Sequence, residues 1–362
     1  MNLFRRLRRL GIALAFGSVA MLVQAGDEDC RIAYDMGSSG IRAGLSGGQR
    51  APRAEIDYLA PLAAGRNLNE TLEATIAALN ALPESAGFPA ECTRVGGGFS
   101  AWRLAAARGV SELIPALRRI KAATGVHVLV IDQQQEGAYG YGGARQLLGD
   151  RLNTSHVLDI GGGSLQIAGE QTTFGEALGQ KIWRRALCQS FGQSEENCRL
   201  QPMAGEQRAA ARQMAEKKLH GIRSTLPTGI SLTAISRPVS RGILPALRRL
   251  TAEGSAAAGF SLESLAQAID KLATLTPDET ALLTGSQPRF VAYLLSDMLL
   301  VEAVLRLTGV NFLQVAEIDL TNLPGLLADE RAFAWAEHYD CYLDRLQNRG
   351  LFAYASDPAS CP

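Results

Sequence analysis

A short motif that occurs twice limits the folds open to this chain. Each copy consists of a strand-like apolar run, an aspartate, a turn of glycine and serine, and a second strand-like run. The first copy reads Asp-Met-Gly-Ser-Ser-Gly at 35–40 and the second Asp-Ile-Gly-Gly-Gly-Ser at 159–164. Glycine-rich turns expose backbone N–H groups that converge on an anion, and an aspartate at the base binds a divalent cation, commonly through water. Two such hairpins facing one another would grip a phosphate chain and its metal ion.

The two hairpins supply the first candidate site residues. Asp35 and Asp159 are the predicted metal-facing pair. The predicted phosphate-binding residues of the turns offer backbone N–H groups and hydroxyls; they are Gly37, Ser38, Ser39, Gly161, Gly162, Gly163 and Ser164. A lone aspartate before glycine is usually a turn former, and a single Gly-Gly-Gly-Ser run is a weak signal. The duplication in matching contexts favours a ligand site.

The N-terminus differs from the rest of the chain. Four arginines within residues 5–9 precede an apolar run at 10–23, which ends in Val-Gln-Ala. This pattern predicts a secretory signal peptide at 1–25. The alternative is an uncleaved membrane anchor, for which the apolar run is short. We therefore expect a periplasmic or secreted protein.

The net charge of the mature chain limits the kinds of partner that it is expected to bind. Removal of residues 1–25, which contain four arginines and no acidic residue, leaves 32 basic and 36 acidic residues, a net charge of −4. This balance does not favour nucleic acid or an anionic membrane as a partner. No second apolar stretch is long enough to cross a bilayer, so we expect no membrane span after signal cleavage. The oligomeric state is left open.

Six cysteines remain in the mature chain, an even number that suits an oxidising compartment. Fifteen pairings exist on paper, and sequence position favours Cys30–Cys92, Cys188–Cys198 and Cys341–Cys361. The first pair precedes two strand-like runs, so parallel neighbouring strands would bring both thiols to one sheet edge. The second pair brackets a short polar loop, and the third would tie down the C-terminal tail. Free buried thiols are the alternative; no Cys/His cluster suggests zinc.

The order of the elements predicts a mixed α/β chain of two domains with an internal repeat. In the first half, a buried strand at 126–131 is followed by a helix at 133–148; in the second, the amphipathic run 291–307 predicts a long helix. The predicted organisation is a signal peptide at 1–25, a first domain at 26–152, a second domain at 153–325, and a C-terminal helix and tail at 326–362.

The two loops resemble the phosphate loops of the actin/Hsp70/sugar-kinase superfamily, and within it the chain resembles the Ppx/GppA (exopolyphosphatase/guanosine pentaphosphate phosphatase) family. Ser-Ala-Trp-Arg at 100–103 resembles the family's Thr-Ser-Ala-Leu-Arg turn, and 131–138 resembles its Ile-Ser-Gly-x-Glu-Glu-Ala-Arg segment. The resemblance implies an α/β, two-domain actin-like ATPase (ribonuclease H-like) fold with duplicated phosphate-loop hairpins. It also implies a metal-dependent phosphoanhydride hydrolase acting on a small-molecule or polymeric phosphate substrate.

The same segments are also similar to the secreted apyrases, the nucleoside triphosphate diphosphohydrolases. Asp-x-Gly-Ser-Ser-Gly-x-Arg is closer to the apyrase first loop, and Glu-Gly-Ala-Tyr-Gly-Tyr at 136–141 is similar to the apyrase Glu-Gly-x-Tyr-x-Trp segment. Ser-Leu-Gln-Ile at 164–167 is similar to the apyrase Ser-Thr-Gln-Ile. Both families share one chemistry, so the resemblance defines the mechanism better than the substrate.

Four further residues receive roles from these resemblances. Glu136 falls on the catalytic glutamate of the Ppx/GppA family and is the candidate base; the alternative is a solvated carboxylate at a helix start. Gln166 matches the apyrase glutamine that orients the attacking water, or is an edge-strand polar residue. Arg103 and Arg42 are candidates for phosphate contact, since arginine suits bidentate capture of phosphate oxygens; surface salt bridges are the alternative. The expected cofactor is a divalent cation: Mg²⁺, or Mn²⁺ or Ca²⁺.

The resemblance covers residues 30–170 well and is thin beyond them. The family's Gly-Thr/Ser-Gly-Thr turn is replaced at 236–240, and its late Ser-x-x-Gly-Leu-Arg-Glu-Gly is replaced near 316–324. These departures leave two other classes open: a binding protein of the same fold without turnover, and a sugar-kinase-type phosphotransferase. Export to an ATP-poor compartment argues against the kinase.

Overall fold

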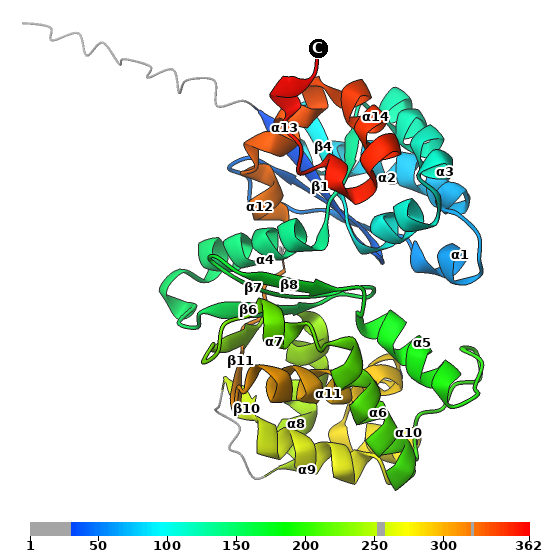
Figure 1. Ribbon diagram of the computed structural model, residues 1–362, viewed down its shortest axis with the longest axis vertical. Coiled ribbons are helices and arrows are strands. Elements are labelled where there is room, and N and C mark those ends of the chain that lie inside the picture. Colours follow the sequence, from blue (N-terminus) through cyan, green and yellow to red (C-terminus); the bar gives the residue numbers. More distant parts are fainter. Residues whose placement is uncertain (1–29, 252–257, 320–321) are drawn as a thin grey trace, which may run out of the picture.

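A computed structural model describes residues 30–251, 258–319 and 322–362 (Figure 1). The predicted signal peptide, residues 1–25, lies outside the described residues. Within them, no helix has both the length and the apolar character needed to cross a membrane. The predicted domain boundaries remain a prediction.

The chain builds two mixed sheets, one in each half of the sequence. The strands of the first sheet are β1 (Arg31–Met36), β2 (Gly40–Leu45), β3 (Arg53–Glu55), β4 (Thr93–Gly98) and β5 (His127–Val130). The strands of the second are β6 (His156–Ile160), β7 (Leu165–Gly169), β8 (Thr173–Glu176), β9 (Leu232–Ala234), β10 (Gly259–Ser261) and β11 (Phe312–Val315).

Both sheets have the same topology. The first is ordered β3-β2-β1-β4-β5, and the second contains β8-β7-β6-β9-β11 in the equivalent places, with β10 added at its edge. In each sheet an antiparallel three-stranded meander is followed by strands parallel to its first member. The predicted α/β repeat is therefore confirmed, and β1 and β6 are equivalent central strands.

Helices pack against both sheets, and one of them, α4 (Gln133–Leu148), lies between the two halves (Figure 1). They are α1 (Leu59–Ala63), α2 (Leu72–Ala86), α3 (Ser100–Thr124), α4 (Gln133–Leu148), α5 (Gln180–Ser190), α6 (Gly205–Lys218), α7 (Ile222–Thr225), α8 (Leu244–Leu250), α9 (Leu262–Leu272), α10 (Pro277–Thr284), α11 (Pro288–Thr308), α12 (Leu323–Leu327), α13 (Glu330–Glu337) and α14 (Tyr339–Arg349). Helix α11 is buried along most of its length and forms the centre of the second core.

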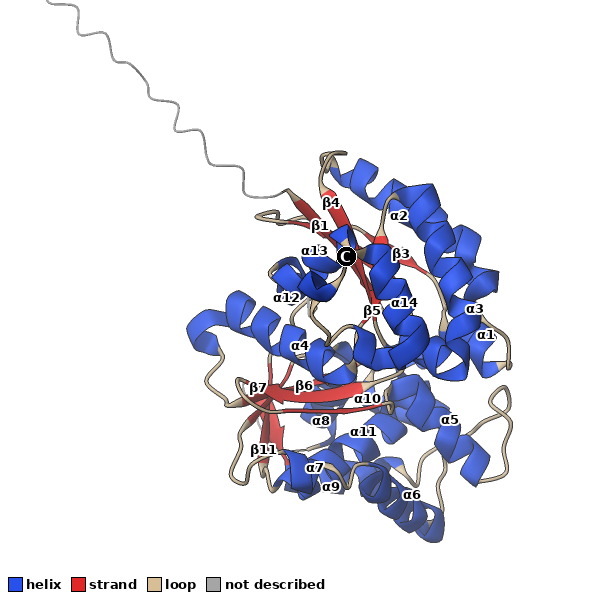
Figure 2. Cartoon of the chain, turned by 45° about the horizontal axis from the view of Figure 1, so that its top comes forward, coloured by secondary structure: helices blue, strands red, loops and turns tan. Residues whose placement is uncertain are grey.

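The chain crosses between its two halves twice. Helix α4 follows β5 of the first sheet but packs against β6, β7 and β8 of the second. Helices α12, α13 and α14 follow the last strand of the second sheet but pack against β1, β2, β4 and α3, so the C-terminus lies on the first half (Figures 1 and 2). We call the first sheet with α1–α3 and α12–α14 the first lobe, and the second sheet with α5–α11 the second lobe.

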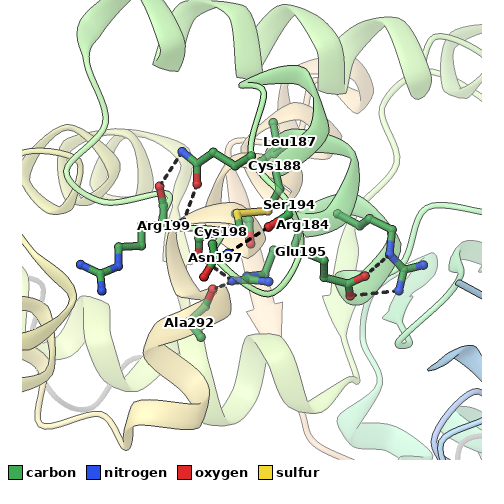
Figure 3. Close-up of a disulfide and its surroundings, with 12 residues drawn as sticks. Arg184, Leu187, Cys188, Ser194, Glu195, Asn197, Cys198, Arg199 and Ala292 are labelled. Carbon is green, nitrogen blue, oxygen red and sulfur yellow. Dashed lines mark hydrogen bonds and ion pairs between the residues drawn. A yellow bond between two sulfur atoms is a disulfide. The ribbon is translucent and has the colours of Figure 1, made fainter. Parts of the chain in front are cut away.

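Three disulfides join the six cysteines in the pairs expected from sequence position: Cys30–Cys92, Cys188–Cys198 and Cys341–Cys361. The parallel pairing of β1 with β4 sets Arg31 opposite Thr93, which places the two preceding cysteines side by side. Around Cys188–Cys198, Arg184 donates to the carbonyl oxygens of Cys198 and Ala292 and joins the loop to α11 (Figure 3).

Removing the Cys30–Cys92 bridge should destabilise the protein more than removing Cys188–Cys198. The sequence separations are 62 and 10 residues, for which the chain-entropy model gives about 4 and about 3 kcal/mol. Urea denaturation of the two double Cys→Ala variants, each with its remaining two disulfides oxidised, measures the difference in the free energy of unfolding. Free thiols at Cys30 and Cys92 in the wild-type protein, found by non-reducing peptide mapping, would contradict the pairing.

Candidate active site

A cleft of about 390 Å³ lies between the two lobes, and both glycine hairpins open into it. The predicted site residues that line it are Asp35, Gly37, Ser38, Ser39, Arg42, Glu136, Asp159, Gly161, Gly162, Ser164 and Gln166. The structure thus brings together residues from β1, β2, α4, β6 and β7, which are far apart in the sequence.

The two hairpins are built alike. Asp35 lies opposite Arg42 across the β1–β2 pair, and Asp159 lies opposite Gln166 across the β6–β7 pair. Each turn is closed by a backbone hydrogen bond: from Gly37 N–H to the Gly40 oxygen at 3.0 Å, and from Gly161 N–H to the Ser164 oxygen at 2.9 Å. The two aspartates therefore occupy equivalent positions at the ends of the central strands.

The hairpins approach one another so closely that a side chain would not fit. A Cβ atom on Gly162 would lie 2.5 Å from the Ser38 hydroxyl, and one on Gly163 would lie 2.2 Å from the Ser100 hydroxyl. Ser100 begins α3, lines the cleft, and has a positive φ of 25°, a conformation that costs energy for residues other than glycine. Glycine at 162 lets the two hairpins face each other, and glycine at 163 leaves room for Ser100 at the start of α3.

Glu136 is held in place by two side chains that meet one of its oxygens. It lies in the first turn of α4, whose N-terminus is capped by Asp132. Arg103 Nη2 lies 2.6 Å from Glu136 Oε2, and Gln166 Nε2 donates to the same oxygen at 2.8 Å. Among the described residues, no hydrogen-bond partner meets the other oxygen, Oε1. The carboxylate therefore has a fixed orientation and one oxygen free to accept a proton.

Arg103 has partners that the sequence analysis did not foresee. Its side chain is buried and also donates to the Ile131 carbonyl oxygen at 2.9 Å. Arg103 does not line the cleft. Its guanidinium group contacts Glu136 and not the substrate phosphate that the sequence analysis predicted. Gly163 likewise does not line the cleft, although its neighbours do.

Asp35, Asp159 and Glu136 lie close enough together in the cleft to affect one another's ionisation. Burial, followed by the charge of Glu136, raises the pKa of Asp35 to about 7 against a smaller opposing effect of Arg42. Burial, then Glu136 and Asp35, raise the pKa of Asp159 to about 7. Asn322, which the sequence analysis missed, donates to Asp35 and keeps its own Oδ1 buried without a partner.

These oxygens fit a hard cation that keeps other ligands. The described residues contain no group of three acidic, histidine or cysteine side chains close enough to hold an ion by themselves. Asp35 and Asp159 would share a cation with water and substrate oxygens, which is how Mg²⁺ is commonly bound. A divalent ion would also relieve the repulsion that raises both pKa values.

Basic side chains also line the cleft. Arg42, Arg53 and Arg237 line it, and burial, followed by the charge of Arg237, lowers the pKa of Arg42. Arg237 donates to Asp319 Oδ1 at 3.0 Å. From the second lobe, Lys181 reaches Asp57 at 3.0 Å across the cleft mouth. Lys181 belongs to no motif of the sequence, and Arg237 lies in the segment 236–240, for which the sequence analysis noted only a departure from the family's turn.

Comparisons with known proteins agree with this geometry. The sequence profile of the Ppx/GppA phosphatase family matches residues 105–318, which include Glu136 and the second hairpin. No curated protein sequence matches the chain. A PPX-GPPA enzyme of Aquifex aeolicus is similar in structure, with 17% identity and a TM-score of 0.63 over 82% of this chain and 98% of its own.

Two further solved structures are similar. An exopolyphosphatase-like protein has 19% identity and a TM-score of 0.61, over 83% of this chain and 98% of its own. An exopolyphosphatase of Cytophaga hutchinsonii has 17% identity and a TM-score of 0.59, over 82% of this chain and 96% of its own. At such identities the likeness shows the fold, and it confirms the predicted two-domain actin-like ATPase fold.

Asp35→Asn and Asp159→Asn should each stabilise the metal-free protein at pH 8 and have little effect at pH 3, below the pKa values of both the folded and the unfolded chain. Because the folded-state pKa values lie above those of the unfolded chain, the folded protein loses stability as pH rises from about 4 through 7. The gain at pH 8 should be about 1–3 kcal/mol. Urea denaturation measures it, with exposed Asp344→Asn as the control. A loss of stability at pH 8 would refute the shifts.

Proposed function

Because this chain belongs to the Ppx/GppA phosphatase family, whose members hydrolyse phosphoanhydride bonds, we propose that it is an exported, metal-dependent enzyme that releases terminal phosphate from polyphosphate or nucleoside polyphosphates. The observation that carries the proposal is the single cleft in which Glu136 faces two glycine hairpins that bear Asp35 and Asp159. These are the parts that such a reaction requires: a base, phosphate donors and hard oxygen ligands.

Glu136 is the proposed base. Its Oε1 accepts the proton of a water that attacks the terminal phosphorus atom, while Arg103 and Gln166 hold its Oε2. Gln166 also lines the cleft and comes from the same hairpin as Asp159, so it sets the distance between the base and the bound phosphate. A base positioned in this way contributes about 10²–10⁴-fold to the rate.

The hairpin backbones and the basic side chains would bind the phosphates. Ser38, Ser39 and Ser164 line the cleft and bring hydroxyl and backbone donors to one point, as the sequence analysis proposed. Arg42, Arg53 and Arg237 also line the cleft and would meet the negative charge of the remaining phosphates. This pairing of donors and cations supports a substrate with several linked phosphates.

The proposed cofactor is a divalent cation, with Mg²⁺ the first choice and Mn²⁺ and Ca²⁺ the alternatives. Enzymes of this family generally depend on divalent cations. Asp35 and Asp159 would hold the ion, and it would supply positive charge at the phosphate oxygens. The side chains of this protein do the remaining work: they position the substrate, hold the water and accept its proton.

Export rests on two features. Residues 1–25 have the pattern of a signal peptide, and all six cysteines form disulfides, which persist in an oxidising compartment. The periplasm or the extracellular space is the proposed location.

An apyrase-like nucleoside di- or triphosphatase is the second candidate. Phe290 is the one aromatic side chain in the lining of the cleft, and aromatic faces stack on nucleobases. A preference for ATP or GTP over long-chain polyphosphate, lost in Phe290→Ala, would favour this candidate. Binding of these ligands without phosphate release would favour the third candidate, a non-catalytic phosphate- or nucleotide-binding protein.

Glu136→Gln should lower phosphate release about 10²–10⁴-fold while the protein stays folded and binds substrate. The amide has nearly the shape of the carboxylate but cannot accept the proton. Phosphate release from polyphosphate, ATP and GTP with Mg²⁺ measures the effect, and calorimetry measures binding. Glu176→Gln, on β8 outside the cleft lining, is the matched control. Wild-type turnover in Glu136→Gln would remove Glu136 from the mechanism.

Chelation should abolish turnover. EDTA is expected to stop phosphate release, and added Mg²⁺, Mn²⁺ or Ca²⁺ should restore it, because the cleft offers hard oxygen ligands. In Asp35→Asn and Asp159→Asn the concentration of metal required should rise. Undiminished activity in EDTA would contradict both metal assignments.

A further inference from the structure

The second glycine hairpin is supported from behind by helix α5. Gln180 N–H donates to the Gly161 carbonyl oxygen at 2.9 Å, and Lys181 N–H donates to the Gly162 oxygen at 2.8 Å. The first N–H groups of a helix have no partner within the helix. Here these groups bind the carbonyl side of the hairpin, so the position of α5 fixes the position of the loop.

The start of α5 packs tightly against the backbone of the hairpin. Gly179 precedes the helix, and a Cβ atom there would lie 2.4 Å from Ser164 N, 2.5 Å from the Gly161 oxygen and 2.6 Å from Gly163 N. Any shift of the helix start is therefore transmitted directly to the backbone of the hairpin.

Helix α11 holds α5 in turn. Trp183 Nε1 donates to the Ser296 carbonyl oxygen at 2.8 Å, and Arg184 Nε donates to the Ala292 oxygen at 3.0 Å. At the N-terminal end of α5, the side chain of Gln180 donates to Asp297 Oδ2. Gln180 also lines the cleft, so its side chain connects the catalytic cavity to the core of the second lobe.

Asp297 is an unusual residue for this position. It is 3% exposed, and its other oxygen, Oδ1, is buried without a hydrogen-bond partner. No ion pair to it occurs among the described residues, and burial raises its pKa to about 8. A buried acid without a cation does not by itself stabilise a fold, and its one hydrogen bond is to Gln180.

We propose that Asp297 is a positioning residue for the proposed reaction: by accepting the Gln180 amide it fixes the start of α5, and through the α5 backbone it sets the second phosphate-binding hairpin. A purely structural role would make the residue important for stability. A positioning role makes it important for the geometry of residues 161–164, which it does not touch.

The first test separates turnover from stability, and it rests on the proposed function. Asp297→Leu approximates the shape of the side chain but accepts no hydrogen bond, whereas Asp297→Asn keeps an acceptor for Gln180. We expect Asp297→Leu to lower kcat for phosphate release about 10–100-fold, with KM within about twofold and a melting temperature at or above that of the wild type. Asp297→Asn should retain wild-type kcat.

The second test does not depend on any activity. Hydrogen exchange followed by mass spectrometry should show faster exchange in peptides that cover residues 159–166 of Asp297→Leu, with no change in those that cover 35–40. Gln180→Ala removes the donor from a half-buried position and should give the same pattern. It keeps the test open if Asp297→Leu fails to fold.

Glu302→Ala is the matched control on the same helix. Glu302 is fully buried in α11, but it pairs with Arg212 and Arg306, away from α5. This variant should lose stability and keep the wild-type exchange at 159–166. The proposal is overturned if Asp297→Leu keeps wild-type exchange there, or if Asp297→Asn behaves like Asp297→Leu. A wild-type protein without turnover would instead overturn the proposed function, because the exchange result stands alone.

Discussion

Three carboxylates gathered in one half-buried cleft impose the main constraint on this structure. Asp35, Asp159 and Glu136 repel one another and lose hydration, so the fold must hold them together against their own electrostatics. The fold places these carboxylates on regular secondary structure. Asp35 and Asp159 end the central strands β1 and β6, each of which is paired on both sides, and Glu136 starts a capped helix. This concentration of carboxylates suits the binding of a cation and the transfer of a proton from water better than it suits the stability of the fold.

Close approach of backbones is the means by which two lobes share one cleft. Glycine occurs where elements of opposite lobes, or a helix and a hairpin, come within contact distance. At Gly137 a Cβ atom would lie 2.5 Å from Thr173 Cγ2, so its absence lets α4 pack on β8 directly beside Glu136. Gly162 does the same for the two hairpins, and Gly179 for the start of α5. The glycine-rich motifs are thus packing requirements as well as phosphate-binding loops.

Local pattern was enough to predict the duplicated hairpins, the strand that becomes β5 and the helix that presents Glu136. It also predicted Cys30–Cys92, because each cysteine precedes a strand-like run, and the two strands, β1 and β4, are the parallel neighbours that the prediction assumed. What it missed depends on long-range contacts. The single helix expected within the C-terminal segment 326–362 is two helices, α13 and α14, which return to the first lobe. Arg103 meets Glu136 only because α3 and α4 follow the neighbouring strands β4 and β5. The hydrophobic periodicity of the sequence gives no information about such long-range contacts.

The helix that carries Glu136 is held from three directions. Arg103 binds it from the first lobe, β7 and β8 pack against it from the second, and the C-terminal segment adds a third anchor. There, Asp329 Oδ2 accepts hydrogen bonds from Tyr139 at 2.6 Å and Tyr354 at 2.7 Å, and Cys341–Cys361 ties the following tail to α14. Tyr139 lies one turn after Glu136 on α4, so the C-terminal residues, which contribute little to the lining of the cleft, still fix the direction in which the base points. Because three separate contacts hold α4, the Glu136 carboxylate has little freedom to reorient. The substrate must therefore bind in the position that this carboxylate defines.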